Sequence, residues 1–174
     1  MPAAAAVAAP RTVWSADAFP SPPWRYDNIQ LTPKADGGGI VATETATDGW
    51  HRVETTLPDL PAKTYLLAVT FATKGPRQLS IFMRDLQLPG TLGAVHCNAA
   101  TGEAFANGGV LDWAIEQLPG DSFRCLTRLK LTKTGAVLGF GLARAGYGTG
   151  PYLGDGKTNI VIQGISLSAV DEAR

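Results

Sequence analysis

The stretch "SFRCLTRLKLT" (residues 122–132) shows the pattern that decides the fold of this chain. Every second residue is apolar or small, and this set consists of Phe123, Cys125, Thr127, Leu129 and Leu131. The positions between them carry the cations Arg124, Arg128 and Lys130. Because successive side chains of a β-strand point to opposite faces, the pattern predicts a strand with one buried face and one exposed face.

The same period of two recurs along the chain, and no segment shows sustained helical periodicity. In "QLSIFMR" (78–84) it places Leu79, Ile81 and Met83 inward, and Gln78, Ser80, Phe82 and Arg84 on the other face. About ten strands at this spacing predict an all-β sandwich or barrel. The further strands are expected at 28–33, 39–46, 50–57, 64–73, 93–99, 112–118, 137–144 and 159–168.

Size and charge narrow the classes of function. The 174 residues suit one domain, and the formal net charge is zero, so the basic excess typical of nucleic-acid binding is missing. The apolar runs, such as residues 65–72, are too short to span a bilayer. The alanine-rich start does not resemble a secretory signal. We expect a flexible arm at 1–11, one sandwich domain at 12–170 and a tail at 171–174.

Three local features add expectations about the backbone and the thiols. Asp48-Gly49 is a hairpin signal. Gly164, within a predicted strand, indicates a bulge or a close backbone approach. Cys97 and Cys125 each fall in a predicted strand; free buried thiols are favoured, and a disulfide between neighbouring strands is the alternative.

Three stretches, in this order, resemble a family of β-sandwich modules of phage and prophage tail or virion proteins, which is related in build to jelly-roll carbohydrate-binding modules. They are "WSADAFPSPPWRYDNIQLTPKADGG", "VHCNAATGEAFANGG" with "AIEQLPGDSFRC", and "GDGKTNIVIQGISL". The chain departs from the family pattern at "DSF" before Arg124-Cys125 and at Ser166-Leu167-Ser168. The matching residues are Asn98, Thr101, Gly102, Ile115, Glu116, Phe123, Arg124, Cys125, Gly154, Asp155, Gly156, Ile160, Ile162 and Gly164.

The resemblance implies a two-sheet antiparallel β-sandwich of jelly-roll (galactose-binding-like) type. It also implies a virion, tail-fibre or other extracellular surface setting, with a homo-oligomer or a larger particle as the assembly. Many modules of this build hold one structural calcium, so Gly154-Asp155-Gly156 could be a calcium loop. Aspartate beside glycine is an ordinary turn pair, and we expect a turn with no metal and no cofactor.

The sequence offers little for catalysis. His96 and Cys97 are adjacent in a predicted strand and therefore point to opposite faces, so they cannot pair with each other. A contact between Cys97 and His51 stays open as an alternative. No serine elbow and no clustered metal-ligand motif occurs in the sequence. We expect no enzymatic activity.

Aromatic residues at predicted loops and strand starts indicate the function. A flat, amphipathic ring can stack on the C–H face of a sugar while neighbouring polar groups bind its hydroxyls. Packing of the tryptophans in the core is the alternative for each of them, whereas Tyr147 and Tyr152, in a glycine-rich loop, are expected to be exposed. The predicted ligand-binding residues are Trp24, Tyr26, Trp50, Arg84, Arg124, Tyr147 and Tyr152.

A second candidate surface depends on how the strands are arranged. If the strands around 78–84 and 122–132 are neighbours, Arg84, Arg124 and Arg128 gather on one sheet face and could meet acidic sugars or another chain. An ordinary solvated face is the alternative. The function predicted from the sequence is non-catalytic binding of a polysaccharide or cell-surface glycan, without nucleic acid or membrane insertion. The alternatives are a structural or oligomerisation module of a phage-like particle and, third, a polysaccharide-degrading enzyme.

Overall fold

The protein is described by a computed structural model. It covers residues 24–73, 75, 77–88, 92–98, 100–144 and 150–170, together with the backbone of 11–15. The expected arm, except its last residue Arg11, and the expected tail lie outside the described residues, as does Tyr147. Within the described part of the chain every regular element is a β-strand.

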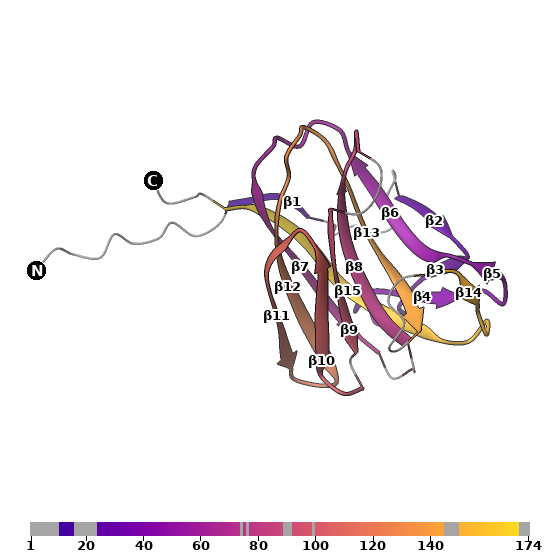
Figure 1. The fold of residues 1–174 in the computed structure, drawn as a ribbon. Helices are drawn as coiled ribbons and strands as arrows, with labels where there is room; N and C mark the ends of the chain where they lie inside the picture. Colours follow the sequence, from indigo (N-terminus) through magenta and orange to yellow (C-terminus); the bar gives the residue numbers. More distant parts are fainter. Residues whose placement is uncertain are drawn as a thin grey trace, which may run out of the picture.

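Two antiparallel sheets pack face to face, as predicted, in a β-sandwich of jelly-roll type (Figure 1). In the seven-stranded sheet the order is β11 (Val110–Leu118), β12 (Ser122–Lys130), β7 (Thr64–Ala72), β15 (Asn159–Ala169), β4 (Ile40–Glu44) and β3 (Ile29–Pro33). Strand β1 (Arg11–Ser15) pairs with the second half of β15.

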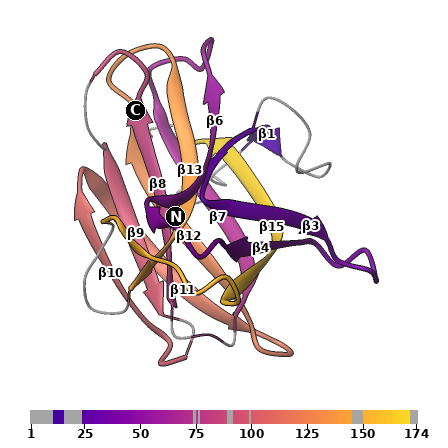
Figure 2. The same ribbon diagram turned by 90° about the vertical axis from the view of Figure 1, so that its right-hand side faces the viewer.

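The six-stranded sheet has the order β10 (Glu103–Gly108), β9 (Gly93–Asn98), β8 (Arg77–Asp85), β13 (Ala136–Arg144), β6 (His51–Leu57) and β2 (Trp24–Asp27). Figure 2 shows β10, β9, β8, β13 and β6 in this sequence across the sheet. A small third sheet joins β5 (Asp48–Gly49) to β14 (Tyr152–Leu153).

The core lies between the two large sheets and is built from the alternate residues that the sequence pattern predicts. Leu79, Ile81 and Met83 of β8 are buried in it, opposite residues of β7 and β12. The seven-stranded sheet contributes Tyr65, Leu67, Val69, Phe71, Phe123, Cys125 and Leu129. Period-two alternation therefore assigned the inward face of these strands correctly.

Two of the local expectations are now decided. The register of β15 against β7 shifts between Ile162 and Gly164, so the predicted bulge is confirmed. The hairpin predicted at Asp48-Gly49 is wrong. These residues form β5, which pairs with β14, while β4 and β6 on either side belong to different sheets. The chain crosses the sandwich at this point instead of turning back within one sheet.

Among the described residues, no helix has the length and apolar character needed to cross a membrane.

Candidate functional site: a groove on the six-stranded sheet

Strand β13 carries only small side chains on the face of the six-stranded sheet that points away from the core. Its inward residues include Leu138, Phe140 and Leu142, so the outward set is Val137, Gly139, Gly141 and Ala143. The neighbours β8 and β6 carry larger outward side chains. This difference in side-chain size leaves a groove between β8 and β6, which the ring of Phe82 fills over Gly139 and which opens into a pocket at Gly141.

The strand register places two rows of side chains across the groove. One row contains Ser80, Gly141 and Arg52, and the next contains Phe82, Gly139 and Glu54. The first row continues to His96 and Phe105 on one side and to Asp27 on the other. The second row continues to Ala94 and Asn107 on one side and to Arg25 on the other. Aromatic, charged and amide groups therefore share this face.

Gly139 is required by the ring of Phe82. A Cβ at Gly139 would lie 2.4 Å from Cζ of Phe82 and 2.7 Å from the carbonyl oxygen of Val53. The ring thus lies directly against bare backbone. A Cβ at Gly141 would lie 2.9 Å from the carbonyl oxygen of His51, which is another close approach. Because Gly139 and Gly141 have no side chains, neighbouring groups can approach the backbone of β13 closely.

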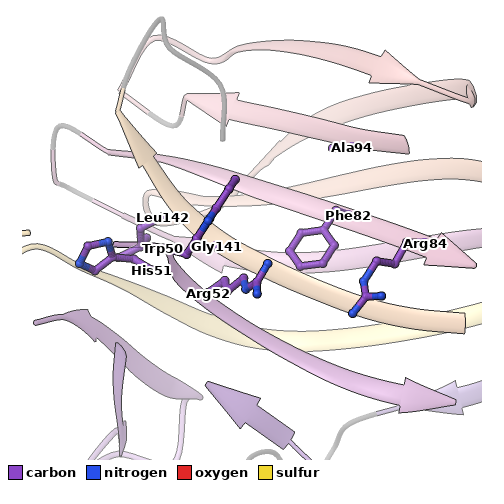
Figure 3. A pocket seen from close by; sticks show the side chains of 8 residues that line it. All are labelled: Trp50, His51, Arg52, Phe82, Arg84, Ala94, Gly141 and Leu142. Atoms are coloured by element: carbon purple, nitrogen blue, oxygen red, sulfur yellow. The ribbon is translucent and has the colours of Figure 1, made fainter. Parts of the chain in front are cut away.

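A pocket opens at the Gly141 end of the groove, and Figure 3 shows its side chains along β13. The Trp50 side chain stands at its rim and is 41% exposed. The Arg52 guanidinium lies 5.5 Å from the centre of the Trp50 ring, a cation–π distance that fixes both side chains. The lining residues are Trp50, His51, Arg52, Phe82, Arg84, Ala94, Gly141 and Leu142.

Ser80 and His96 form a buried hydrogen-bonded pair beside the groove. Nδ1 of His96 lies 2.7 Å from Oγ of Ser80, and Nδ2 of Asn107 lies 3.1 Å from Nε2 of His96. Burial lowers the pKa of His96. These contacts link β8, β9 and β10.

A second polar cluster lies inside the sandwich, around the carboxylate of Glu44. Arg77 donates to it from Nε and Nη2 over 3.0 and 2.9 Å. The hydroxyl of Tyr152 donates over 2.6 Å, and the backbone N–H of Asp155 donates over 2.8 Å. His51 stacks on the Tyr152 ring with 4.4 Å between ring centres. Burial, and then the Glu44 carboxylate, raise the pKa of Tyr152. This cluster ties β4, β8 and β14 together.

The Gly154-Asp155-Gly156 segment is a turn in which the carboxylate is used by the chain itself. Asp155 Oδ1 accepts from the backbone N–H groups of Lys157 and Thr158, and Oδ2 accepts from the Thr158 hydroxyl at 2.6 Å. Among the described residues, no group of three or more His, Cys, Asp or Glu side chains is placed to hold a metal ion. These hydrogen bonds agree with the turn that we expected. The absence of bound calcium remains a prediction.

These hydrogen bonds, those from Thr158 first, lower the pKa of Asp155 below its ordinary value of 3.8. A lowered folded-state pKa means that the ionised carboxylate stabilises the fold above about pH 3.8 and that this contribution disappears as the pH falls. We therefore expect Asp155→Ala to lower the urea midpoint at pH 7, with the difference from the unmodified chain shrinking below pH 3.8. Asp59→Ala, at an exposed turn, is the control. A difference that stays constant from pH 7 to pH 2 would contradict this interpretation.

The structure brings two of the predicted ligand residues, Trp50 and Arg84, to the same pocket. Trp24 and Tyr26 lie on the other face of β2, in register with Thr55 and Val53. Trp24 is half-buried and packs against the core, with its ring centre 6.4 Å from that of Phe140. Tyr26 is 57% exposed. For Trp24, therefore, the alternative of packing against the core applies instead of ligand binding.

Two expectations need correction. Tyr152 was expected to be exposed, but it is buried, because its hydroxyl binds the Glu44 carboxylate inside the protein. The arginine face that would join Arg84 to Arg124 and Arg128 does not exist, because β8 and β12 belong to different sheets. Arg124 and Arg128 point away from the core on the seven-stranded sheet, where Arg128 lies 3.6 Å from Asp112.

Both cysteines are free and buried in the core, as the favoured alternative stated. Cys97 belongs to β9 and Cys125 to β12, so the two thiols come from opposite sheets. Interaction with the Cys125 side chain and burial raise the pKa of Cys97, which keeps this thiol protonated. Any contact between Cys97 and His51 lacks support, because the hydrogen bond of His51 is to Thr45.

Sequence reasoning missed Arg52, Glu54 and the two groove glycines. A signal was present in "VLGFGLAR" (137–144). Glycines occupy alternate positions of this predicted strand, so one of its faces lacks side chains at two positions. Phe82 was assigned correctly to the outward face of β8, and a lone aromatic residue among polar residues there is a second signal. Which strands flank β13 could not be inferred from either signal.

No protein-family profile and no curated protein sequence matches the chain. Among solved structures, the neighbours include jelly-roll carbohydrate-binding modules. The apo form of BiXyn10A CBM1 superposes with a TM-score of 0.51 and 10% sequence identity, over 91% of this chain and 98% of that one. At this identity the comparison shows a shared fold.

Two longer proteins also contain a similar unit. The CBM22-1–GH10 modules of Clostridium thermocellum endo-1,4-β-D-xylanase 10B, complexed with xylohexaose, superpose with a TM-score of 0.46 and 12% identity, over 87% of this chain and 27% of that one. The enzymatically active domain of bacteriophage CBA120 tailspike protein 4 gives a TM-score of 0.45 and 9% identity, over 84% of this chain and 19% of that one. This chain thus spans 27% of the length of the first protein and 19% of the length of the second.

Proposed function

We propose that this protein is a non-catalytic carbohydrate-binding module that binds a polysaccharide or cell-surface glycan in the groove along β13. The observation that carries the proposal is the pocket over Gly141, where the rings of Trp50 and Phe82 lie beside the side chains of Arg52 and Arg84. A sugar ring stacks on aromatic side chains and directs its hydroxyls to flanking polar groups. Trp50 supplies the exposed ring, Phe82 lines the pocket with a ring that is 8% exposed, and Arg52 and Arg84 supply the polar groups.

The fold shared with BiXyn10A CBM1 is compatible with this function, although the argument rests on the groove itself. The virion, tail-fibre or cell-surface setting that the sequence resemblance implies is part of the proposal. In such a setting several copies would bind one polymer, and avidity would raise a weak single-site affinity.

The test is binding of soluble polysaccharides in affinity gel electrophoresis, with the mobility of the protein as the readout. We expect Trp50→Ala to weaken retardation about 10- to 100-fold, because it removes the exposed ring at the rim of the pocket. Trp113→Ala is the matched control. Trp113 is similarly exposed, at 37%, but lies on β11 of the other sheet. Equal losses in the two variants, or no retardation by any polysaccharide, would reject the groove as a glycan site.

A second candidate function, an assembly module, is favoured by β11. This strand is at one end of the seven-stranded sheet, and it exposes Leu111 and Trp113. Exposed edge strands with apolar side chains can pair with other chains. Light scattering on the purified protein decides between the two: a defined oligomer that Trp113→Lys dissociates would support assembly through β11.

A further inference from the structure

Arg52 and Arg84, the two arginines that line the pocket, each have an acidic partner within the protein. Nε of Arg52 lies 3.0 Å from Oδ2 of Asp27, and Nη2 of Arg84 lies 3.5 Å from Oε1 of Glu54. Arg25, whose side chain is 70% exposed and lies 3.8 Å from Asp27, adds one positive charge at the edge of this face. An anionic ligand in the pocket would therefore have to displace Asp27 or Glu54 to gain Arg52 or Arg84 as a partner.

Two buried acceptors on the same face have no donor. Oε2 of Glu54 and Oε1 of Gln78 make no hydrogen bond in the described structure, although the two residues are only 6% and 5% exposed. Leaving a buried acceptor unpaired costs about 1–3 kcal/mol. Glu54 is in register with Gly139, over which the Phe82 ring lies, and Gln78 is in register with Ala143 of the same strand. Both acceptors thus flank β13, one from each wall.

We propose that the groove selects an uncharged glycan, whose hydroxyl groups donate to Glu54 and Gln78, and that it discriminates against uronate-containing glycans. This inference rests on the proposed function. A neutral sugar supplies hydroxyl donors to acceptors that lack them. A uronate supplies a carboxylate, which is an acceptor only and is repelled by Glu54. The two acceptor atoms are buried, so the proposal includes a movement of side chains around Glu54, among them Arg84, which contacts Oε1 and is 31% exposed.

The experiment compares matched polymers that differ only in charge. Xyloglucan and galactomannan are tested beside the same polymers oxidised at their primary hydroxyls to uronates, with polygalacturonate as a natural acid. We expect at least one neutral polymer to retard the protein, and its oxidised form to bind at least tenfold more weakly. Equal or tighter binding of the acidic forms overturns the inference and leaves the proposed function standing. Absence of binding to every polymer, neutral or acidic, rejects the proposed function itself.

Glu54→Gln tests the residue that sets the selectivity. The substitution keeps the shape of the side chain, removes its charge and releases Arg84 from its ion pair. We expect binding of the neutral polymer to weaken about tenfold, and the ratio of neutral to oxidised binding to fall towards one. Glu116→Gln is the control, because Glu116 is exposed on the other sheet in register with Arg124. An unchanged ratio in Glu54→Gln overturns the assignment of selectivity to this carboxylate.

Gln78→Leu separates a role in binding from a role in folding. Leucine removes the unpaired acceptor and has a similar size, so the urea midpoint should stay the same or rise. Binding of the neutral polymer should weaken about three- to tenfold because one hydroxyl loses its acceptor. Full binding in Gln78→Leu would show that this amide does not meet the ligand and would limit the site to Glu54.

Discussion

Replacing Arg77 by methionine is expected to lower the free energy of unfolding by about 3–5 kcal/mol, because it leaves a buried carboxylate without its cation. The Glu44 side chain is fully buried, and its two strongest partners are the Nε and Nη2 groups of Arg77. The hydroxyl of Tyr152 and the N–H of Asp155 remain after the substitution but carry no positive charge. Urea denaturation at pH 7 measures the change.

Two further variants show whether the loss comes from the unpaired charge. Arg124→Met removes an arginine from the exposed face of β12 and should change stability by less than about 0.5 kcal/mol. Glu44→Gln combined with Arg77→Met removes both charges, and we expect the double variant to recover part of the loss seen in Arg77→Met alone. A double variant less stable than Arg77→Met would show that the ion pair is not the origin of the effect.

Gly39→Ala is expected to lower the free energy of unfolding by about 3 kcal/mol, through backbone strain and overlap together. Gly39 has a φ of +124°, a conformation that side chains disfavour. A Cβ there would also lie 2.3 Å from the carbonyl oxygen of Ile162, in β15 beside β4. A Cβ atom is fixed by its own backbone, and the Ile162 oxygen is a backbone atom, so no side-chain rotation can relieve the overlap. The start of the β4–β15 pairing would have to shift.

Gly37→Ala is the matched control in the same turn. Gly37 also has a positive φ, of +73°, but nothing lies within 4 Å of its Cβ position. We expect a loss of only about 1 kcal/mol, from the left-handed backbone alone. The difference between the two variants measures the overlap with Ile162. Similar losses in both would show that the close approach to β15 is relieved by small movements.

Much of the fold could be predicted because its main signal is local. Alternation assigned Leu79, Ile81 and Met83 to the core, and Phe82 and Arg84 to the opposite face of the same strand. The glycine in β15 marked a bulge that the register confirms. Short elements were missed, among them β2 and β10, whose side chains are partly or fully exposed and so give only a weak alternating pattern.

The candidate site was predicted only in part, since it depends on which strands are neighbours. Trp50 and Arg84, both expected from the sequence to bind a ligand, line one pocket, and this could not be inferred because β6, which follows Trp50, and β8 are separated by β13, which comes much later in the chain. The expected exposure of Tyr152 failed because its partner, Glu44, is 108 residues away. Tyr152 and Glu44 meet only in the folded chain.

The sequence by itself determined that this chain forms strands with one apolar face, since a period of two is written into consecutive residues and requires no distant partner. The tertiary structure decided which strands pair, and therefore which outward faces adjoin. It placed Gly139 of β13 between Phe82 and Glu54, and it placed Arg84 and Arg124 on different sheets of the sandwich. Strand pairing is fixed by packing and register across the whole domain, and these are not encoded in any single stretch.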